Sequence, residues 1–374
     1  MNSKRKPLNK LFIILNIFVV LIYLLVCLVP VIDPGKFWYI SLLGLAFPLL
    51  FFAVLFFFIS SLLFKSNWAL LSFLALIFSW QQISAVFKFY PPRSFNVVKA
   101  TNNLRLLSWN VSSWDEFNKA KRGGTSYRDL MFEEVRKTNA DVLCFQEFLE
   151  STNPAGYEPN IPELQKMGYP YHYYIRTQAV IDNTEMGMVI FSKYAIINTG
   201  SFDFKDKGTA QQVIYADVKF KNETIRVITI HLQSVKFGKE EYIIINEIKH
   251  TDKEGLKDSK NIISKLKRAY PFRKYQAEVV NEFVKKSPYP VILCGDFNDV
   301  PNSYAYFTIK GNMQDAFLEK GSGIGRTFRF ISPTLRIDYI FANKKFDVTQ
   351  YHRLTVPYSD HYGIMADFYI NPAK

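Results

Sequence analysis

The chain has 374 residues, enough for more than one domain, and its three cysteines are too few for a disulfide framework. Its formal net charge of +13 is uneven, because the first 100 residues carry nine lysines or arginines and one acid, whereas the remaining 274 carry 37 basic and 32 acidic residues. The larger part is therefore only mildly basic, which suits an anionic substrate but does not demand a polynucleotide.

The N-terminal part is strongly apolar and is expected to lie in a membrane. Residues 11–32 carry no charge, and residues 37–64 are rich in phenylalanine and leucine, so both exceed the roughly 20 residues that span a hydrocarbon core. Residues 68–87 form a weaker third segment, which two adjacent glutamines interrupt. We therefore expect residues 1–90 to form a transmembrane anchor of two or three helices, with three favoured.

The charges beside these segments set the expected orientation. Four basic residues within the first ten should hold the N-terminus in the cytoplasm. Three spans would then carry the rest of the chain to the extracytoplasmic side, whereas two would leave it in the cytoplasm. We expect an integral membrane protein whose globular domain, residues 103–374, is extracytoplasmic and follows a proline-containing linker over residues 91–102.

From residue 104 onward, strand-like apolar runs alternate with helical and polar stretches. The expected strands cover residues 104–111, 142–146, 188–191, 212–220, 226–231, 291–295, 337–342 and 364–370. The expected helices cover residues 127–139 and 272–286. Residues 237–267 are lysine-rich and poorly patterned, and we expect them to form a surface insertion.

One expected strand ends in a turn that carries two polar side chains. Residues 291–295 are apolar or small, which suits a strand buried on both faces. Gly295 allows a sharp turn, and Asp296 and Asn298 lie two residues apart just beyond it. Because alternate side chains of an extended chain share one face, we expect these two to point toward the same place.

Other expected strands end or begin beside similar residues. Each alone is commonplace, since an isolated polar residue after a strand is usually a cap or a turn residue. The set comprises Asn110, Glu147, His231, Asp338, Asp360 and His361. Carboxylate and amide oxygens suit Mg²⁺ or Mn²⁺, and the sequence has no group of cysteines and histidines with the spacing of a zinc site.

Together these segments resemble the endonuclease/exonuclease/phosphatase superfamily, in the family's order and over about residues 103–370. The matching stretches are 107–111, 141–147, 187–192, 229–231, 295–298, 336–340 and 359–361. The resemblance implies an α/β fold of four layers, in which two mixed β-sheets pack face to face between outer helices. The site would lie at one edge of this sandwich, and residues 1–100 are outside the resemblance.

The resemblance also implies a division of chemical roles. Glu147 would bind a divalent metal, Mg²⁺ or Mn²⁺, with Asn110 and Asp360 nearby as direct or water-mediated ligands. The metal would polarise a phosphoryl oxygen. His361 would accept a proton from the attacking water, and Asp338 would hold its imidazole in the required tautomer.

The remaining residues would act on the phosphate. Asp296 and Asn298 would orient the nucleophile and the phosphate. His231 would donate to a phosphoryl oxygen or protonate the leaving group, and Glu185 would pair with His231.

These roles describe a metal-dependent hydrolase of phosphate esters, most simply a phosphodiesterase, anchored in a membrane. The substrate stays open between nucleic acid, phospholipid and a small phosphate ester, and nothing in the sequence points to a protein partner. The alternative is a membrane-anchored binding protein that has kept the fold without activity. Such a protein would be expected to have replaced at least one of the acidic, amide or histidine residues named above.

Overall fold

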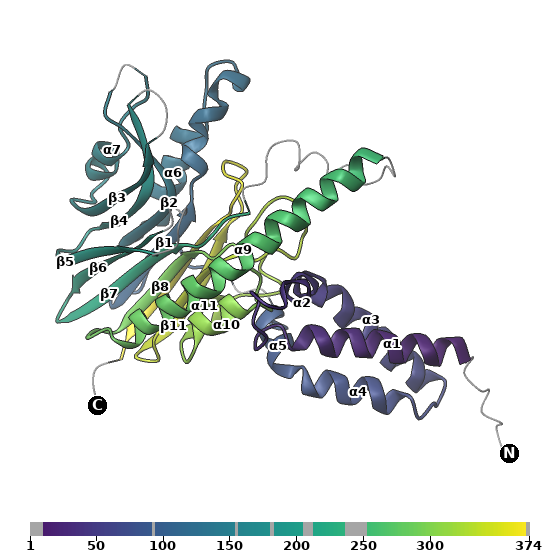
Figure 1. The fold of residues 1–374 in the computed structure, drawn as a ribbon. Helices are drawn as coiled ribbons and strands as arrows, with labels where there is room; N and C mark the ends of the chain where they lie inside the picture. The colour runs from purple at the N-terminus through teal and green to yellow at the C-terminus, as the bar shows by residue number, and fades with distance from the viewer. Residues whose placement is uncertain are drawn as a thin grey trace.

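The computed structural model describes residues 10–91, 94–153, 156–179, 183–204, 212–235 and 253–371, and of residues 253–260 the backbone alone. A bundle of apolar helices projects from a larger part built of two β-sheets and their covering helices (Figure 1). The candidate site lies in the larger part and borders the bundle.

The N-terminal bundle contains five α-helices and one short 3₁₀ helix. They are α1 (Lys10–Cys27), α2 (Trp38–Leu43), η1 (Gly44–Ala46), α3 (Phe47–Leu63), α4 (Ala69–Phe78) and α5 (Trp80–Val86). By length and composition, α1 and the continuous stretch from Trp38 to Leu63 could each cross a membrane. The third expected segment is α4 followed by α5, bent by 65° between them, so the described chain has two such spans, or three if the bent pair is one.

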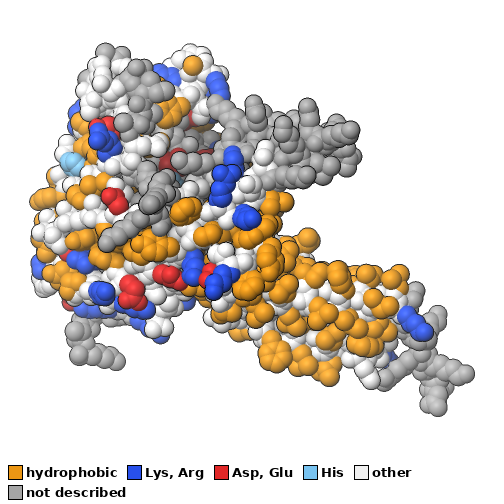
Figure 2. Space-filling view, viewed as in Figure 1, with side chains coloured by type: hydrophobic (Ala, Val, Ile, Leu, Met, Phe, Trp, Pro, Cys, Tyr) orange, Lys and Arg blue, Asp and Glu red, His pale blue; other side chains and the backbone are white. Residues whose placement is uncertain are grey.

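The bundle is apolar outside and carries its polar contacts inside. Leu21, Leu49 and Phe78 are examples of its exposed outer side chains. In the interior the Ser72 hydroxyl donates to Oδ1 of Asn16 at 2.9 Å, and polar side chains of this kind join helices inside membrane bundles. Figure 2 shows the resulting apolar surface, which covers the visible side of the bundle.

The larger part contains two six-stranded mixed sheets. The first has the strand order β11-β12-β1-β2-β4-β3, and the second has the order β5-β6-β7-β8-β10-β9. Their bounds are β1 (Asn103–Asn110), β2 (Val142–Ser151), β3 (Tyr171–Ala179), β4 (Thr184–Ser192), β5 (Ile196–Asp203), β6 (Gln212–Phe220), β7 (Glu223–His231), β8 (Val291–Asp296), β9 (Gln314–Asp315), β10 (Asp338–Ala342), β11 (Phe346–Leu354) and β12 (Gly363–Ile370). Each sheet has one parallel pair at its centre, β1 with β2 and β7 with β8, and the other pairs are antiparallel.

The sheets pack face to face and helices cover their outer faces, which gives the expected four layers. Leu106 of the first sheet and Ile214 of the second belong to one buried cluster between the sheets. The covering helices are α6 (Arg128–Thr138) and α7 (Ile161–Lys166) on the first sheet, and α9 (Lys253–Lys285) and α10 (Tyr304–Lys310) on the second, with the short α11 (Ala316–Lys320) nearby. The α/β sandwich predicted from the sequence is therefore confirmed.

Strands were missed where they lie at the edges of the sheets. β3, β5 and β11 are all edge strands, and the half-exposed pattern of β5 offers no apolar run to recognise. The eight strands that were expected lie in or next to the centre of the sheets. Cys144 and Cys294 are buried free thiols between the sheets, so the described structure holds no disulfide there.

Helix α9 begins well before the expected helix at residue 272. The expected helix starts directly after Pro271, and proline lacks the amide donor that a helix interior uses, but α9 runs through this residue. Of the expected insertion over residues 237–267, the part up to residue 252 lies outside the described residues, and the rest is the first half of this helix.

The bundle is joined to the sandwich by polar contacts at several points. Nδ2 of Asn302 donates to the carbonyl of Val26 at 3.1 Å, and the buried Arg336 guanidinium donates to the carbonyl of Ala85 at the end of α5. The Lys274 ammonium lies 2.8 Å from the Asp33 carboxylate. These contacts fix the sandwich against the end of the bundle.

Candidate active site

Polar side chains from five strand boundaries meet at one edge of the sandwich. Asn110 ends β1, His231 ends β7, Asp296 ends β8 and Asp338 begins β10. In the second sheet His231 pairs in register with Asp296, and Asp296 pairs with Asp338. His361 lies just before β12 in the first sheet. The topology thus brings together residues that the sequence placed at separate strand boundaries.

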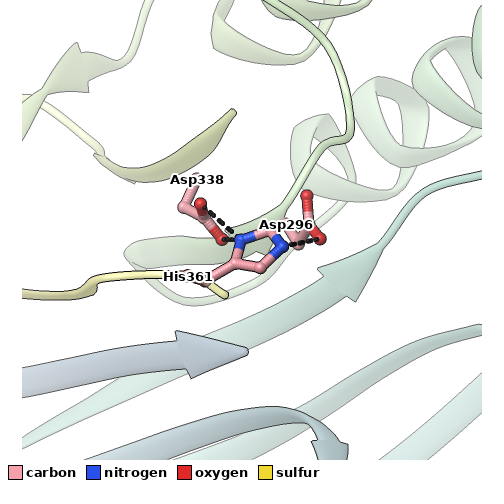
Figure 3. A group of neighbouring side chains, drawn as sticks. All are labelled: Asp296, Asp338 and His361. Carbon is pink, nitrogen blue, oxygen red and sulfur yellow. Dashed lines mark hydrogen bonds and ion pairs between the residues drawn. The ribbon is translucent and has the colours of Figure 1, made fainter. Parts of the chain in front are cut away.

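His361 and Asp338 form a buried pair across the two sheets (Figure 3). Nδ1 of His361 lies 2.9 Å from Oδ2 and 3.1 Å from Oδ1 of Asp338. A carboxylate only accepts, so Nδ1 carries the proton and Nε2 is directed toward Asp296, 3.6 Å from its Oδ2. Burial alone would lower the pKa of His361, but the Asp338 and Asp296 carboxylates outweigh it and raise that pKa well above its usual value.

Further contacts hold His361 through its backbone carbonyl and through its ring. Nε1 of Trp109 donates to the carbonyl of His361 at 2.9 Å. The Phe328 ring lies edge-on to the imidazole at 5.1 Å between centroids. On the other side of the pair, the backbone N–H of Asp338 donates to Oγ1 of Thr327 at 3.1 Å. These contacts leave the His361 side chain one orientation.

The turn after β8 has a backbone conformation that glycine adopts readily and other residues do not. Gly295 has φ +136°, and a Cβ at this position would lie 2.0 Å from the carbonyl oxygen of Ile230. The backbone N–H of Asn298 donates to Oδ1 of Asp296 at 2.8 Å, and Nδ2 of Asn298 donates to the carbonyl of Leu232 at 3.1 Å. The Asn298 side chain therefore holds the segment that follows His231, while Asp296 faces His361.

Glu147 lies at an irregularity in β2 that turns its side chain into the site. The register of β2 against β4 shifts between Phe145 and Phe148, and Glu147 has φ +50°. Nδ2 of Asn110 lies 3.1 Å from Oε1 of Glu147 and 3.2 Å from Oδ2 of Asp296. The Asn110 amide thus links two carboxylates. Burial and the nearby Asp360 carboxylate raise the pKa of Glu147.

His231 and Asp360 complete the polar wall. Nε2 of His231 lies 3.6 Å from Oδ2 of Asp296 and 3.8 Å from Oε1 of Glu147, and it has no hydrogen-bond partner among the described residues. Asp360 lines the same cavity as Glu147 and accepts a hydrogen bond from Oγ of Ser359 at 3.2 Å.

The expected pair between Glu185 and His231 is replaced by another contact. Glu185 lies in β4, and its Oε1 accepts a hydrogen bond from Nη1 of Arg176 at 3.0 Å. Arg176 lies on the adjacent strand β3. This strand was not predicted from the sequence, so Arg176 could not be placed beside Glu185. Glu185 therefore has its partner in its own sheet.

Two neighbouring sets of side chains could hold a cation. Asp296, Asp338 and His361 each offer a ligand atom within 4.8 Å of the others. Glu147 and Asp360 are the second set, and their oxygens suit Mg²⁺ or Mn²⁺ better than a histidine-containing set does. The gathering of carboxylates at one cavity is itself unfavourable without a positive partner, so the residues present fit a divalent cation.

The site opens into a cavity of about 360 Å³. Its polar end is formed by Glu147, Asp296, Asn298, Asp360 and His361. Two further residues of the wall, Arg273 and Asp299, were missed from the sequence. Arg273 lies within a helix, where nothing in the periodicity distinguishes a site residue from a surface one, whereas Asp299 directly follows the recognised turn and was a detectable candidate.

Two family models match the chain, one over each part. A family model described as the endonuclease/exonuclease/phosphatase family matches residues 107–361. A second model, described as a domain of unknown function, matches residues 9–86. A search of curated proteins gave no match.

Solved structures show the same fold at low sequence identity. A protein of this family from Beutenbergia cavernae is 18% identical, with a TM-score of 0.52 over 73% of this chain and 72% of its own. The catalytic domain of human Nocturnin, solved with a bound sulfate anion, is 19% identical, with a TM-score of 0.51 over 72% of this chain and 94% of its own. A conserved protein of unknown function from Enterococcus faecalis is 16% identical, with a TM-score of 0.50 over 72% of this chain and 100% of its own.

Proposed function

Because the chain belongs to the endonuclease/exonuclease/phosphatase family, we propose that it is a divalent-metal-dependent hydrolase of phosphate esters, most simply a phosphodiesterase. The observation that carries this proposal is the His361–Asp338 pair, in which Nε2 of His361 faces Asp296 beside a wall of carboxylates. A binding protein has no need for a buried histidine fixed in one tautomer and one orientation. A hydrolase needs this arrangement to activate water.

His361 acts as the general base in its neutral form, which a cation bound beside the same carboxylates would favour by lowering the pKa that they raise. Its Nε2 accepts the proton of the attacking water, while Asp338 keeps the proton on Nδ1 and stabilises the imidazolium that forms. Asp296, on the other side of Nε2, holds the water in line with the imidazole. The reaction adds this water to phosphorus, breaks the bond between phosphorus and the leaving oxygen, and returns the proton to that oxygen.

Glu147 and Asp360 would hold the cation, with Asn110 positioning the Glu147 carboxylate. When bound, the cation polarises a phosphoryl oxygen and offsets the charge that develops on the phosphate. His361 and Asp338 hydrogen-bond to each other, which favours Glu147 and Asp360 over the Asp296–Asp338–His361 group as the main ligands. Mg²⁺ commonly binds through one or two carboxylates and substrate phosphate, and this set supplies that number.

His231 acts on the far side of the phosphate. Its Nε2 lacks a protein partner among the described residues and can donate to a phosphoryl oxygen or to the leaving oxygen. Asn298 keeps His231 in place through the carbonyl of Leu232. Glu185, which is paired with Arg176, has no role in this scheme.

We further propose that residues 1–90 anchor the enzyme in a membrane, that residues 91–102 connect it, and that residues 103–374 form an extracytoplasmic catalytic domain. The two long apolar stretches support the anchor, and the bent α4–α5 pair supports a third crossing. Protease protection in right-side-out vesicles tests the orientation. Digestion of the catalytic domain from the outside is expected, and full protection would mean two crossings and a cytoplasmic site.

The activity is tested with the purified full chain and a panel of phosphate esters. Bis(p-nitrophenyl) phosphate, an oligonucleotide, phospholipid vesicles and inositol phosphates are each incubated with Mg²⁺, Mn²⁺ or EDTA. Hydrolysis of at least one ester that EDTA abolishes is the expected result. The absence of hydrolysis under all these conditions would favour a binding protein that has kept the fold.

A further inference from the structure

The catalytic cavity is polar at one end and apolar along the rest of its wall. Beyond the carboxylates and His361, it is lined by aliphatic side chains that include Ile262, Ile263 and Leu266 of α9. Val300 and Leu335 lie in the same wall. A phosphate group and its cation would occupy only the polar end, so the apolar wall is left for another part of the ligand.

The apolar wall reaches the outer surface of the helical bundle. Leu45, in η1 between α2 and α3, lines the cavity and is also 38% exposed as part of the bundle's outward apolar surface. Ile263 on α9 lines the cavity too and is likewise 38% exposed. Figure 2 shows apolar surface continuing from the bundle onto the adjoining side of the sandwich. One end of the cavity is therefore formed by side chains that a membrane would contact.

Aromatic and basic residues mark this junction as the level of the lipid headgroups. The Lys267 ammonium of α9 lies over the Trp38 ring at 5.2 Å, and Phe37 and Tyr39 beside it are exposed. Tryptophan, tyrosine and lysine gather at membrane–water interfaces, because each has an apolar body and a polar end. Together with the Lys274–Asp33 ion pair, this contact holds α9 against α2 and the turn that precedes it.

The charges of the cavity suit a single phosphate better than a polynucleotide. Among the described residues, Arg273 is the one arginine or lysine of its lining, against four acids. Arg273 is 2% exposed; its Nε donates to the carbonyl of Gln233 at 2.8 Å, and its Nη2 has no partner among the described residues. A groove for nucleic acid would carry a series of cations along the phosphate backbone.

We propose that the substrate is a membrane lipid with a phosphate ester in its headgroup. This inference rests on the proposed function. The phosphate lies at Glu147 and His361, and the acyl chain lies along Leu266, Ile263 and Leu45 toward the bilayer. Water attacks phosphorus, the phosphorus–oxygen bond to the leaving alcohol breaks, and that alcohol takes a proton, so that a phosphodiester lipid gives a phosphomonoester and an alcohol.

The first test compares each lipid with its own headgroup in water-soluble form. The full chain in nanodiscs is given phosphatidylglycerol or phosphatidylethanolamine vesicles, and separately the corresponding deacylated glycerophosphodiesters, all with Mg²⁺. We expect kcat/KM for at least one lipid to exceed that of its deacylated counterpart by about 100-fold or more, since each buried methylene contributes up to about fourfold. Equal or faster hydrolysis of the deacylated compound, or of an oligonucleotide, would overturn the proposal.

The second test uses two matched leucines on the bundle. Leu45 lines the cavity, whereas Leu49 is 74% exposed on α3 one turn later and does not line it. Leu45→Asn should lower the ratio of lipid to bis(p-nitrophenyl) phosphate hydrolysis by about tenfold, and Leu49→Asn should leave that ratio unchanged. Equal effects of the two substitutions would contradict a chain-binding role for the wall.

A binding measurement separates this proposal from the proposed function. Calorimetric titration of His361→Ala nanodiscs with butyl and octyl phosphate, corrected with empty nanodiscs, does not require turnover. We expect octyl phosphate to bind at least about tenfold more tightly, and Leu45→Asn to remove that difference. If no ester is hydrolysed but octyl phosphate still binds more tightly than butyl phosphate, the proposed function fails and the lipid site stands. If soluble esters are hydrolysed but the two phosphates bind equally, the lipid site fails.

Discussion

Nε2 of Gln146 donates a hydrogen bond of 2.8 Å to Oγ1 of Thr229, and this bond joins the two sheets directly beneath the site. Gln146 precedes Glu147 in β2, and Thr229 lies two residues before His231 in β7. Both side chains are fully buried. The bond therefore fixes the distance between the proposed metal ligand and the proposed proton donor, which come from different sheets.

Breaking this bond should cost both stability and activity. Gln146→Leu leaves the Thr229 hydroxyl buried without its donor, and we expect a loss of about 1–3 kcal/mol in the free energy of unfolding. Replacing both partners, with Gln146→Leu and Thr229→Val, should recover part of that stability but not the turnover. Chemical denaturation and a turnover assay of both single variants and the double variant measure the two effects. Additive stability losses would contradict a direct bond.

The orientation of His361 should depend on Asp338. Asp338→Asn keeps the shape of the side chain but removes the carboxylate that holds the proton on Nδ1. We expect kcat to fall by at least about 100-fold while the thermal midpoint changes little. A turnover within a few-fold of the wild type would exclude the pair from the mechanism.

The turn after β8 should tolerate no side chain at position 295. Gly295→Ala adds a Cβ 2.0 Å from the Ile230 carbonyl oxygen at φ +136°, and we expect destabilisation of at least about 3 kcal/mol. Gly156→Ala is the matched control, because no atom of the described residues lies within 4 Å of its Cβ position. Thermal unfolding of both variants measures the difference, and similar midpoints would contradict the crowding described at Gly295.

Stability should depend on pH through Glu150. Burial raises the pKa of Glu150 from 4.5 to about 7, although the backbone N–H groups of Asn160 and Ile161 donate to its carboxylate. The folded state therefore binds this proton more tightly than the unfolded state, so the contribution of Glu150 to stability is greatest below pH 4.5, falls as the pH rises toward 7 and is constant above it.

The comparison with Glu150→Gln isolates this effect. At about 1.4 kcal/mol per pKa unit, the shift from 4.5 to about 7 makes the loss in the wild type at most about 3.5 kcal/mol. The Gln variant should be the more stable protein at pH 8 and should lose this advantage near pH 4.5. Thermal midpoints of both proteins across this range measure it, and parallel curves would show that Glu150 does not titrate in this way.

The metal requirement should depend on Glu147. Glu147→Gln removes a charged ligand, so the Mg²⁺ concentration for half-maximal activity should rise by at least about tenfold. Glu185→Gln is the control, because Glu185 is paired with Arg176 in the first sheet. An unchanged Mg²⁺ requirement in Glu147→Gln would indicate that the cation binds at the Asp296–Asp338–His361 group instead.

The sequence predicted the central part of the fold, and it named candidate residues that the structure brings together at one edge of the sandwich. Asp338 was recognisable because an acid inside an apolar strand is costly unless it has a partner, whereas Asp296 and His361 stood out by their place beside strand ends and by the family resemblance. The edge strands β3, β5 and β11 were not recognisable, since one edge of each pairs with no strand and their apolar patterns are weak.

Local sequence patterns did not predict the contacts between segments that are distant in the chain. Arg176 is the partner of Glu185 only because β3 lies beside β4, and β3 itself was missed. Arg273 and Leu45 reach the same cavity from a helix and from the bundle, 228 residues apart in the chain. Neither residue stands out in its own segment, because an arginine on a helix is usually at the surface and a leucine in an apolar stretch is ordinary.

Turnover of bis(p-nitrophenyl) phosphate by the full chain, compared with that of His361→Ala, tests the central claim most directly. With Mg²⁺ present we expect the wild type to be active and EDTA-sensitive, and the variant to be slower by at least about 100-fold at an unchanged thermal midpoint. Equal turnover by the two proteins, or wild-type turnover that EDTA does not affect, would contradict a metal-dependent hydrolase that uses His361 as its base.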